Sequence, residues 1–414
     1  MNVAEEVAQA VEGEGQASAQ SLADAIRFLS IDAILRAGEG HQGVPLGMAE
    51  IATALFTRHL KFNPADPTWP DRDRFVLSNG HGSMLLFSLL HLTGYAGMPI
   101  EQIKRFRELG SHCEGHPEFA PAHGVEVTTG LLGQGIANAV GMAVAEAALS
   151  ARFGPDLVDH RTYAFVGDGC LQEGIGQEAL ALAGHLRLGK LTVCWDDTRI
   201  TDDGATALSI SEDVAERARV AGWQVFEVDG HDIEAVSRAL AAARDDLRPT
   251  FIACRTTIAR GLTRLQGQRG GHSGKLFAED RDAMAVELGW TSAPFEMPAE
   301  VRAAWRAAGR RCEAEHAGWR HRLAALPADR RAEFERVMRG ELPAGWREAL
   351  HAWTVQARAS APAASAILMS GEISDALNDV LPEKLVACAD LEAPTGHKRR
   401  LVAFTAEQRG GGYL

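Results

Sequence analysis

Positive charge and cysteine are both scarce in this sequence. Its 414 residues include 42 Lys and Arg against 55 Asp and Glu, which gives a formal net charge of −13 at pH 7. A nucleic-acid-binding surface needs a basic stripe, so this deficit argues against a nucleic-acid partner. It does not exclude an anionic substrate, because such a ligand needs only local cations. The cysteines are too scattered for a disulfide framework or a zinc site: Cys113, Cys170, Cys194, Cys254, Cys312 and Cys388.

The amino terminus lacks the features of a targeting segment. Residues 1–20 are acidic, rich in Ala, Gln and Gly, and have neither a basic start nor an apolar core, so they predict a disordered tail. No run in the sequence is long and apolar enough to predict a membrane span. We therefore expect a cytoplasmic protein with no membrane partner.

Apolar segments of strand and helix length alternate through much of the chain. Strands are expected in the segment that begins at Arg72, before its glycine-rich turn, and at 162–166, 191–195, 223–228 and 250–255. Helices are expected at 21–37, 48–60, 84–92, 135–148, 175–187 and 233–244. Strands that alternate with helices in this way form a parallel sheet covered on both faces, so the predicted fold class is α/β.

Composition divides the chain further. We expect the α/β domain to span 21–297, because Arg, Ala, Glu and Trp at helical spacing predict a helical connector over 298–349. Residues 350–414 predict the beginning of a second α/β domain, with a strand at 385–389. At 414 residues the chain is long enough for two or more domains.

The most informative stretch is the turn Gly167-Asp168-Gly169, which follows the expected strand at 162–166. A Gly-Asp-Gly triplet alone is about as often a plain turn as a binding site. Here the next strand, 191–195, ends in further oxygen side chains. Carboxyl ends of neighbouring parallel strands meet at one crevice, and oxygens are the ligands that Mg²⁺ prefers. The pattern thus suits Mg²⁺ with a diphosphate.

Four histidines lie in glycine-rich loops: His41, His81, His116 and His272. A histidine in such a loop is more often a surface residue than a catalytic one. The loop with His81 opens a helix, and a helix N-terminus behind small residues can bind an anion. The polar segment 261–274, which carries His272, is expected to be a mobile lid.

Together these segments closely resemble the transketolase family, which uses thiamine diphosphate. The matches are the run from Gly167 to Ile175, the segment 196–204, a loop around His41 similar to Ser-Gly-His-Pro-Gly, and Gly-His-Pro-Glu at 115–118. The resemblance implies a thiamine-diphosphate-binding fold and a two-carbon ketol transfer from a ketose phosphate to an aldose.

The resemblance also implies site residues. Metal ligands for Mg²⁺, or for Ca²⁺ or Mn²⁺, would be Asp168, the Ile200 carbonyl and Thr198, the last standing where the family has Asn. Catalytic groups would be His41, His116 and His272. Cofactor-binding residues would be His81, Gly130, Leu132, Gly167, Gly169, Cys170, Glu173, Glu178 and His272, with the two glutamates between paired cofactor sites.

The resemblance covers about the first two thirds of the family's length. The family's activating Glu would come from a later segment. We therefore expect one subunit of a split transketolase, with a partner that supplies the remaining pyrimidine-binding and C-terminal domains, and self-association into a heterotetramer. The alternative is a catalytically inactive homologue that acts as a binding or regulatory protein.

Overall fold

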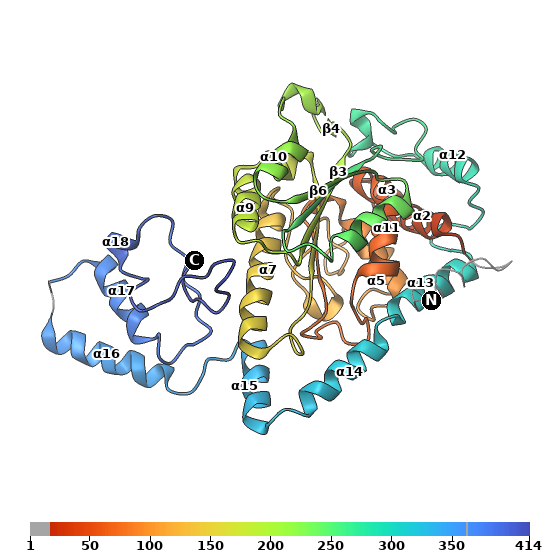
Figure 1. Cartoon of the computed structure of the whole chain (residues 1–414). Helices are drawn as coiled ribbons and strands as arrows, with labels where there is room; N and C mark the ends of the chain where they lie inside the picture. The colour runs from red at the N-terminus through yellow and green to blue at the C-terminus, as the bar shows by residue number, and fades with distance from the viewer. Residues whose placement is uncertain (1–16, 362) are drawn as a thin grey trace. The chain divides into compact units, whose positions relative to one another are not determined.

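The structure is a computed structural model that describes residues 17–361 and 363–414 (Figure 1). The chain divides into two compact units. Unit 1 comprises Met1–Val144 and His160–His316, and unit 2 comprises Ala145–Asp159 and Ala317–Leu414. Of the tail expected at 1–20, residues 1–16 lie outside the described residues, and helix α2 begins at Ala19.

A parallel sheet forms the centre of unit 1. Among the described residues it has five strands in the order β1-β2-β3-β7-β6, and every neighbouring pair is parallel. The strands are β1 (Arg74–Leu77), β2 (Thr162–Gly167), β3 (Leu191–Asp197), β6 (Gln224–Asp229) and β7 (Thr250–Arg255). The predicted α/β class is confirmed, and so are its five expected strands, including β1 in the segment that begins at Arg72.

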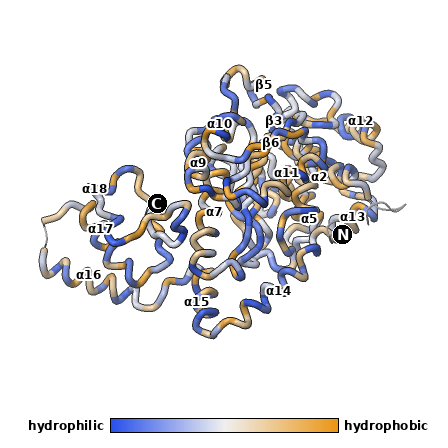
Figure 2. Tube along the Cα trace, viewed as in Figure 1, coloured by the Kyte–Doolittle hydropathy of each residue, from blue (hydrophilic) through white to orange (hydrophobic). Residues whose placement is uncertain are grey.

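Both faces of the sheet are buried. In β2, Tyr163 and Phe165 belong to the main hydrophobic cluster, while Ala164 and Val166, which alternate with them, are also inaccessible to solvent. Successive side chains of a strand point to opposite faces, so this continuous burial requires helices on both sides. Hydrophobic residues accordingly run through the strands of unit 1 (Figure 2).

One face is covered by helices that also pack on each other: α2 (Ala19–Ala37), α4 (Ala49–Ala54), α5 (Ser83–Thr93), α11 (Ile233–Ala242) and α13 (Ala299–Arg310). Helix α2 is well delimited, because the Ser18 hydroxyl accepts from the Ser21 amide and Gly38 adopts φ 78° at the other end. The expected helix at 48–60 is α4 followed by a π-helical turn, Leu55–His59.

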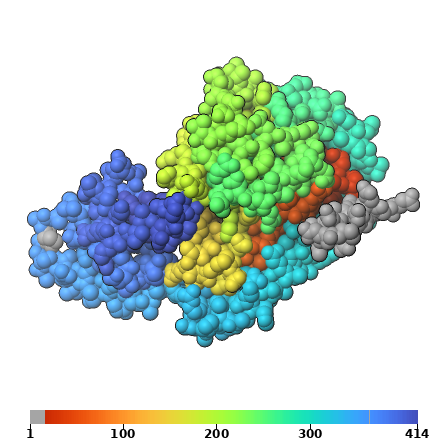
Figure 3. Space-filling model, viewed as in Figure 1, coloured from red at the N-terminus to blue at the C-terminus, as the bar shows by residue number. Residues whose placement is uncertain are grey.

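On the opposite face, α9 (Gly174–His185) is tied to the sheet through Trp223. The Trp223 indole donates to the Leu180 carbonyl at 2.8 Å, and its ring lies edge-on to Phe251 of β7. The chain between α9 and β7, drawn in green, makes up much of the visible face of unit 1 (Figure 3). The small-residue helix expected at 135–148 is α7 (Gln134–Phe153).

Shorter elements connect these layers. They are α3 (Gly43–Gly47), α6 (Ile100–Ile103), α8 (Asp168–Gln172), α10 (Val214–Val220), α12 (Ala278–Leu288), 3-10 turns at Gly80–Gly82, Pro121–His123, Thr206–Leu208 and Arg269–Gly271, and the antiparallel pair β4 (Ile200–Thr201) and β5 (Gly204–Ala205).

Unit 2 is mainly helical, with α14 (Glu313–Ala324, which begins in unit 1), α15 (Ala328–Met338), α16 (Trp346–Ser360), α17 (Ala366–Ala376) and α18 (Glu392–Thr395). Its small core packs Phe334 edge-on to Phe153 and close to Trp319. The strand expected at 385–389 is wrong, since only Val386 forms an isolated bridge, with Tyr413. Among the described residues no helix is long and apolar enough to cross a membrane.

A close helix contact allows a test of the packing in unit 1. A Cβ added to Gly184 of α9 would lie 1.7 Å from the Ala221 carbonyl oxygen, so α9 would have to move. We expect Gly184→Ala to lower the free energy of unfolding by about 1–3 kcal/mol, the usual range for overpacking. Denaturant unfolding of both variants would measure this. The control is Gly174→Ala in the same helix, where a Cβ meets no described atom within 4 Å, and an equal loss in both would contradict the packing argument.

Candidate functional site

The site is built at the carboxyl edge of the sheet. Strands β1, β2 and β3 are neighbours, and in the register of β2 and β3 Gly167 lies opposite Asp196. The turns that follow these strands therefore emerge side by side, where parallel sheets commonly bind ligands. Asp168 begins α8, and Thr198 follows β3 directly.

The three expected metal ligands come together at this edge. The Thr198 hydroxyl oxygen lies 3.3 Å from Asp168 Oδ2 and 3.0 Å from the Ile200 carbonyl oxygen. The indole of Trp195 donates to Asp168 Oδ1 at 3.2 Å and fixes the carboxylate from the other side. One carboxylate, one hydroxyl and one carbonyl form a hard oxygen set, which fits Mg²⁺ or Ca²⁺ with a diphosphate completing the coordination.

Buried acids surround this group. Burial, reinforced by the neighbouring Asp197 carboxylate, raises the pKa of Asp168 to about 7. Burial also raises the pKa of Asp196 to about 7, although the Thr256 hydroxyl donates to it at 2.5 Å. Among the described residues, no three or more His, Cys, Asp or Glu side chains form a metal-binding cluster. The oxygen set therefore relies on Asp168 as its carboxylate.

The four loop histidines, far apart in sequence, form one cluster. The ring centroid of His41 lies 5.2 Å from that of His81, 5.3 Å from that of His272 and 6.4 Å from that of His116. The ring centroids of His81 and His272 are 4.7 Å apart. All four are half-buried. We call this group the histidine cluster. Its members therefore gather at one place and do not stand on separate surface loops.

Burial lowers the pKa of every imidazole in the histidine cluster. For His41 the pKa falls to about 4, with the nearby His272 and Arg107 adding to the effect of burial. The pKa of His81 falls well below its usual range because of burial and of the neighbouring His272, His41 and His116. Neutral rings can each donate one hydrogen bond and accept another, which suits contacts with sugar hydroxyls.

Close backbone contacts hold the histidine loops against each other. A Cβ on Gly82 would lie 2.4 Å from Val44 Cβ, so only glycine lets the His81 loop approach the segment after His41. The buried amide of Gln42 donates to the carbonyls of Gly270 and Gly274 at 3.2 and 3.0 Å. These bonds join the His41 loop to the loop with His272. That the segment 261–274 is a mobile lid stays a prediction.

The remaining expected cofactor residues lie around the Asp168 turn. Leu132 packs on it, because a Cβ on Gly169 would lie 2.7 Å from Leu132 Cδ1. Gly130 lies against the His116 ring, where a Cβ would be 3.1 Å from Cδ2. Cys170 is inaccessible to solvent, and burial raises the pKa of its thiol. Thiolate chemistry is therefore disfavoured there.

Glu173 and Glu178 have a different setting. Both are exposed, Glu173 at the cap of α9 and Glu178 within that helix. Gly133 lies against Glu173 and Ile175, because a Cβ there would be 2.8 Å from Glu173 Cβ and 3.0 Å from Ile175 Cγ2. Leu131, two residues before Gly133, is 71% accessible and Ile175 is 44% accessible. We call Leu131, Glu173, Ile175 and Glu178 the α9 face.

Sequence reasoning missed two polar residues of the crevice. Asn79, at the end of β1, has a buried side-chain oxygen without a hydrogen-bond partner among the described residues. Arg107 adopts φ 63°, pairs with Glu39 at 2.8 Å, and has a buried Nε that likewise finds no described partner. Asn79 could have been found from its place after a strand; Arg107 offered no comparable pattern.

Comparison with known proteins identifies the family. Residues 18–343 match the model of the transketolase thiamine diphosphate binding domain. The chain belongs to the transketolase family. It is 50% identical over 338 residues to a transketolase of Sinorhizobium medicae and 48% identical over 378 residues to one of Cereibacter sphaeroides, covering 81% and 91% of this chain.

Solved transketolases have the same fold. That of Leishmania mexicana superposes with a TM-score of 0.89 at 40% identity, covering 96% of this chain and 60% of that one. A Pichia stipitis transketolase in complex with sedoheptulose 7-phosphate gives 0.88 at 38% identity, covering 95% and 60%. Against the two bacterial transketolases this chain spans 49% and 57% of their lengths, about half.

Thr198, which stands where the resemblance implies Asn, is followed by Arg199. Arg199 adopts φ 56° in a region that favours glycine, and its side chain is 70% exposed, with Nε 3.8 Å from Asp197. A left-handed conformation costs an L-residue roughly 1–2 kcal/mol. Arg199 therefore carries backbone strain beside Thr198 and the Ile200 carbonyl.

This strain can be measured. We expect Arg199→Gly to raise the free energy of unfolding by up to about 1 kcal/mol, because relief of strain exceeds the extra entropy that glycine has in the unfolded chain. Arg199→Ala is the matched control, since it removes the guanidinium and keeps the strained backbone. Chemical denaturation of the three proteins would decide. If Arg199→Ala raised the free energy of unfolding by a similar amount, the arginine side chain and not the backbone strain would be the cause.

Proposed function

We propose that this chain is the diphosphate-binding part of a thiamine-diphosphate-dependent transketolase. It would transfer a two-carbon ketol unit from a ketose phosphate to an aldose acceptor. The observation that carries the proposal is the convergence of the Asp168 oxygen group and the histidine cluster at one edge of the sheet. Family membership supplies the cofactor class.

Asp168, Thr198 and the Ile200 carbonyl would hold Mg²⁺, and His81 with the Gly169 amide would bind the diphosphate. When bound, thiamine diphosphate supplies the electron sink for carbon–carbon cleavage. His41, His116 and His272 would bind sugar hydroxyls and pass protons at their ring nitrogens, a role typically worth 10²–10⁴-fold each.

We further propose that the activity needs the domains found in the other half of the relatives, supplied by a partner subunit. Two observations support this. The bacterial relatives are about twice as long as their matched region. In addition, none of the fifteen residues of α16, all of them described, is buried. A helix that packs in a complete domain would bury one side.

The α9 face is a surface suited to a second copy of this chain. Leu131 and Ile175 are apolar and exposed, and Glu173 and Glu178 lie beside them. Large exposed apolar side chains grouped in this way often mark an association surface. Two-fold pairing is the commonest arrangement, which gives a heterotetramer of two copies of each subunit.

Removal of the carboxylate tests the cofactor site. We expect Asp168→Ala to weaken thiamine diphosphate binding in Mg²⁺ at least tenfold, or about 1.4 kcal/mol, since the diphosphate charge is then poorly neutralised. Thr198→Asn should hold the affinity or raise it. Titration calorimetry would measure both, with Asp282→Ala, an exposed site on α12, as control. Unchanged affinity in Asp168→Ala would refute the assignment.

Activity and assembly test the partner requirement. We expect the purified chain alone to show no ketol transfer between xylulose and ribose phosphates. Addition of a polypeptide with the pyrimidine-binding and C-terminal domains should restore turnover, and light scattering should give the mass of two copies of each. Turnover by the chain alone would contradict the split. Cofactor binding that never leads to turnover would favour the inactive, regulatory homologue, to which the strained Thr198-Arg199 pair points.

A further inference from the structure

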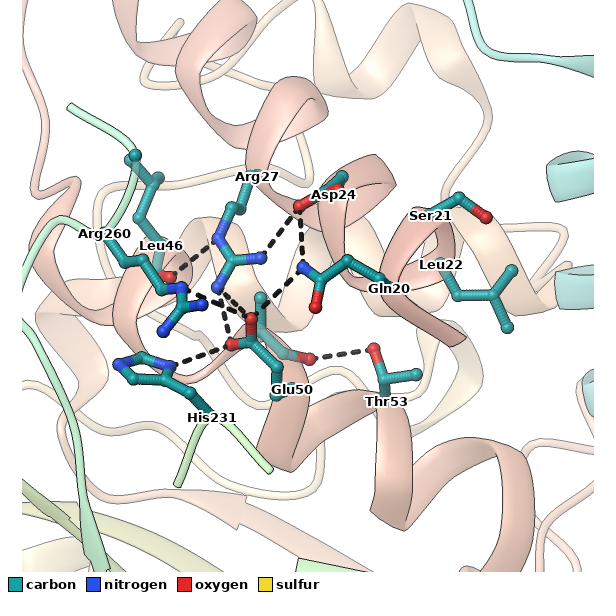
Figure 4. A network of polar contacts seen from close by, with 12 residues as sticks. Gln20, Ser21, Leu22, Asp24, Arg27, Leu46, Glu50, Thr53, His231 and Arg260 are labelled. Atoms are coloured by element: carbon teal, nitrogen blue, oxygen red, sulfur yellow. Dashed lines mark hydrogen bonds and ion pairs between the residues drawn. The ribbon is translucent and has the colours of Figure 1, made fainter. Parts of the chain in front are cut away.

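A buried ionic group lies behind the histidine cluster, and Figure 4 shows its contacts. Glu50 of α4 and Arg27 of α2 are both inaccessible to solvent. Arg27 Nη2 donates to the two Glu50 oxygens at 2.6 and 2.5 Å, and its Nη1 donates to Asp24 at 2.9 Å. His231 and Arg260 approach Glu50 at 3.2 and 3.7 Å. We call these five residues the Glu50 group.

Glu50 stays ionised in this setting. Burial alone would raise the pKa of its carboxyl group, but the hydrogen bond from His231 and the charge and hydrogen bonds of Arg27 outweigh burial and hold it at about 2. Charges this deeply buried are costly to remove from water and add little stability over a well-packed apolar core. Stability alone therefore does not account for the Glu50 group, whose contacts fix the positions of the residues that it joins.

His231 extends the group to the backbone. Its Nε2 accepts from the Thr257 amide at 2.8 Å, and its Nδ1 faces Glu50 at 3.2 Å. An amide N–H can only donate, so Nε2 must be unprotonated and the ring must donate from Nδ1 to Glu50. The hydrogen bonds therefore run in one direction: the Thr257 amide donates to His231, and His231 donates to Glu50.

The Glu50 group also reaches the segment after His41. Arg27 Nε donates to the Leu46 carbonyl of α3 at 3.0 Å. Thus one carboxylate fixes two backbone points. One is Leu46, in the segment that follows His41, whose contact with Arg27 is drawn in Figure 4. The other is Thr257, in the segment that leads to His272.

These two segments are joined at the histidine cluster itself. The Gly43 amide donates to the His272 carbonyl at 3.3 Å, and the Ala259 amide donates to the Gly43 carbonyl at 3.3 Å. A shift of Leu46 relative to Thr257 would be transmitted through these bonds to the two histidines.

We propose that Glu50 is a positioning residue that sets the separation of His41 and His272 through Arg27–Leu46 on one side and His231–Thr257 on the other. The catalytic use of that separation rests on the proposed transketolase function; the positioning itself does not.

The first test uses Glu50→Gln, which keeps the size of the side chain and removes its charge. Amide hydrogen exchange of the full chain without cofactor should become at least tenfold faster in 40–47 and 256–274, while exchange in β2 and β3 stays unchanged. In the enzyme reconstituted with the partner domains, kcat should fall at least tenfold with little change in cofactor affinity. Glu234→Gln is the control, because Glu234 also pairs with an arginine, Arg58, but on the surface.

His231→Phe provides a second variant if Glu50→Gln fails to fold, because it keeps the Arg27–Glu50 pair. It should speed exchange mainly in 256–274, with a smaller rise in 40–47 through the bond from the Gly43 amide to the His272 carbonyl. Unchanged exchange in both segments, or an equal rise throughout unit 1, would overturn the proposal. A reconstituted wild-type enzyme without activity would instead count against the proposed function, since the exchange measurement needs no cofactor.

Discussion

The parallel pairing of β2 with β3 is the constraint on which the site depends. Their register puts Gly167 opposite Asp196, so the turns that carry Asp168 and Thr198 leave the sheet within hydrogen-bond reach of each other. A slip of one residue would turn every side chain of a strand to the other face. Because both faces of β2 are closely packed, such a slip would put Phe165 where the smaller Ala164 or Val166 fits, and the core thereby protects the geometry of the site.

Much of the fold could be predicted because local pattern and tertiary structure agree. Strand β7 spans the predicted 250–255, and β3 and α9 differ from the expected bounds by two residues at most. The segment 385–389 fails for the opposite reason. It has the apolar composition of a strand, but its backbone partner among the described residues is the short stretch 412–414, too little for a ladder.

The site was only partly predictable. The resemblance located Asp168 and the four histidines, and the structure brings them to one edge of the sheet. The resemblance could not reveal Gln42 or Glu50, because their contacts join residues about 180 to 230 positions apart in the sequence. Nor could it give the pKa of His41, which depends on how four loops exclude water from a shared space. Residue types can be read from sequence, whereas desolvation belongs to the folded arrangement.

Trp195 gives this crevice an intrinsic optical probe. Its indole N–H donates directly to the carboxylate of Asp168 and is 8% exposed. The emission of an indole depends on the charges next to its ring nitrogen. A cation that engages Asp168 would change that local field, so occupancy of the oxygen group should be visible as a change in tryptophan fluorescence, with no label attached to the protein.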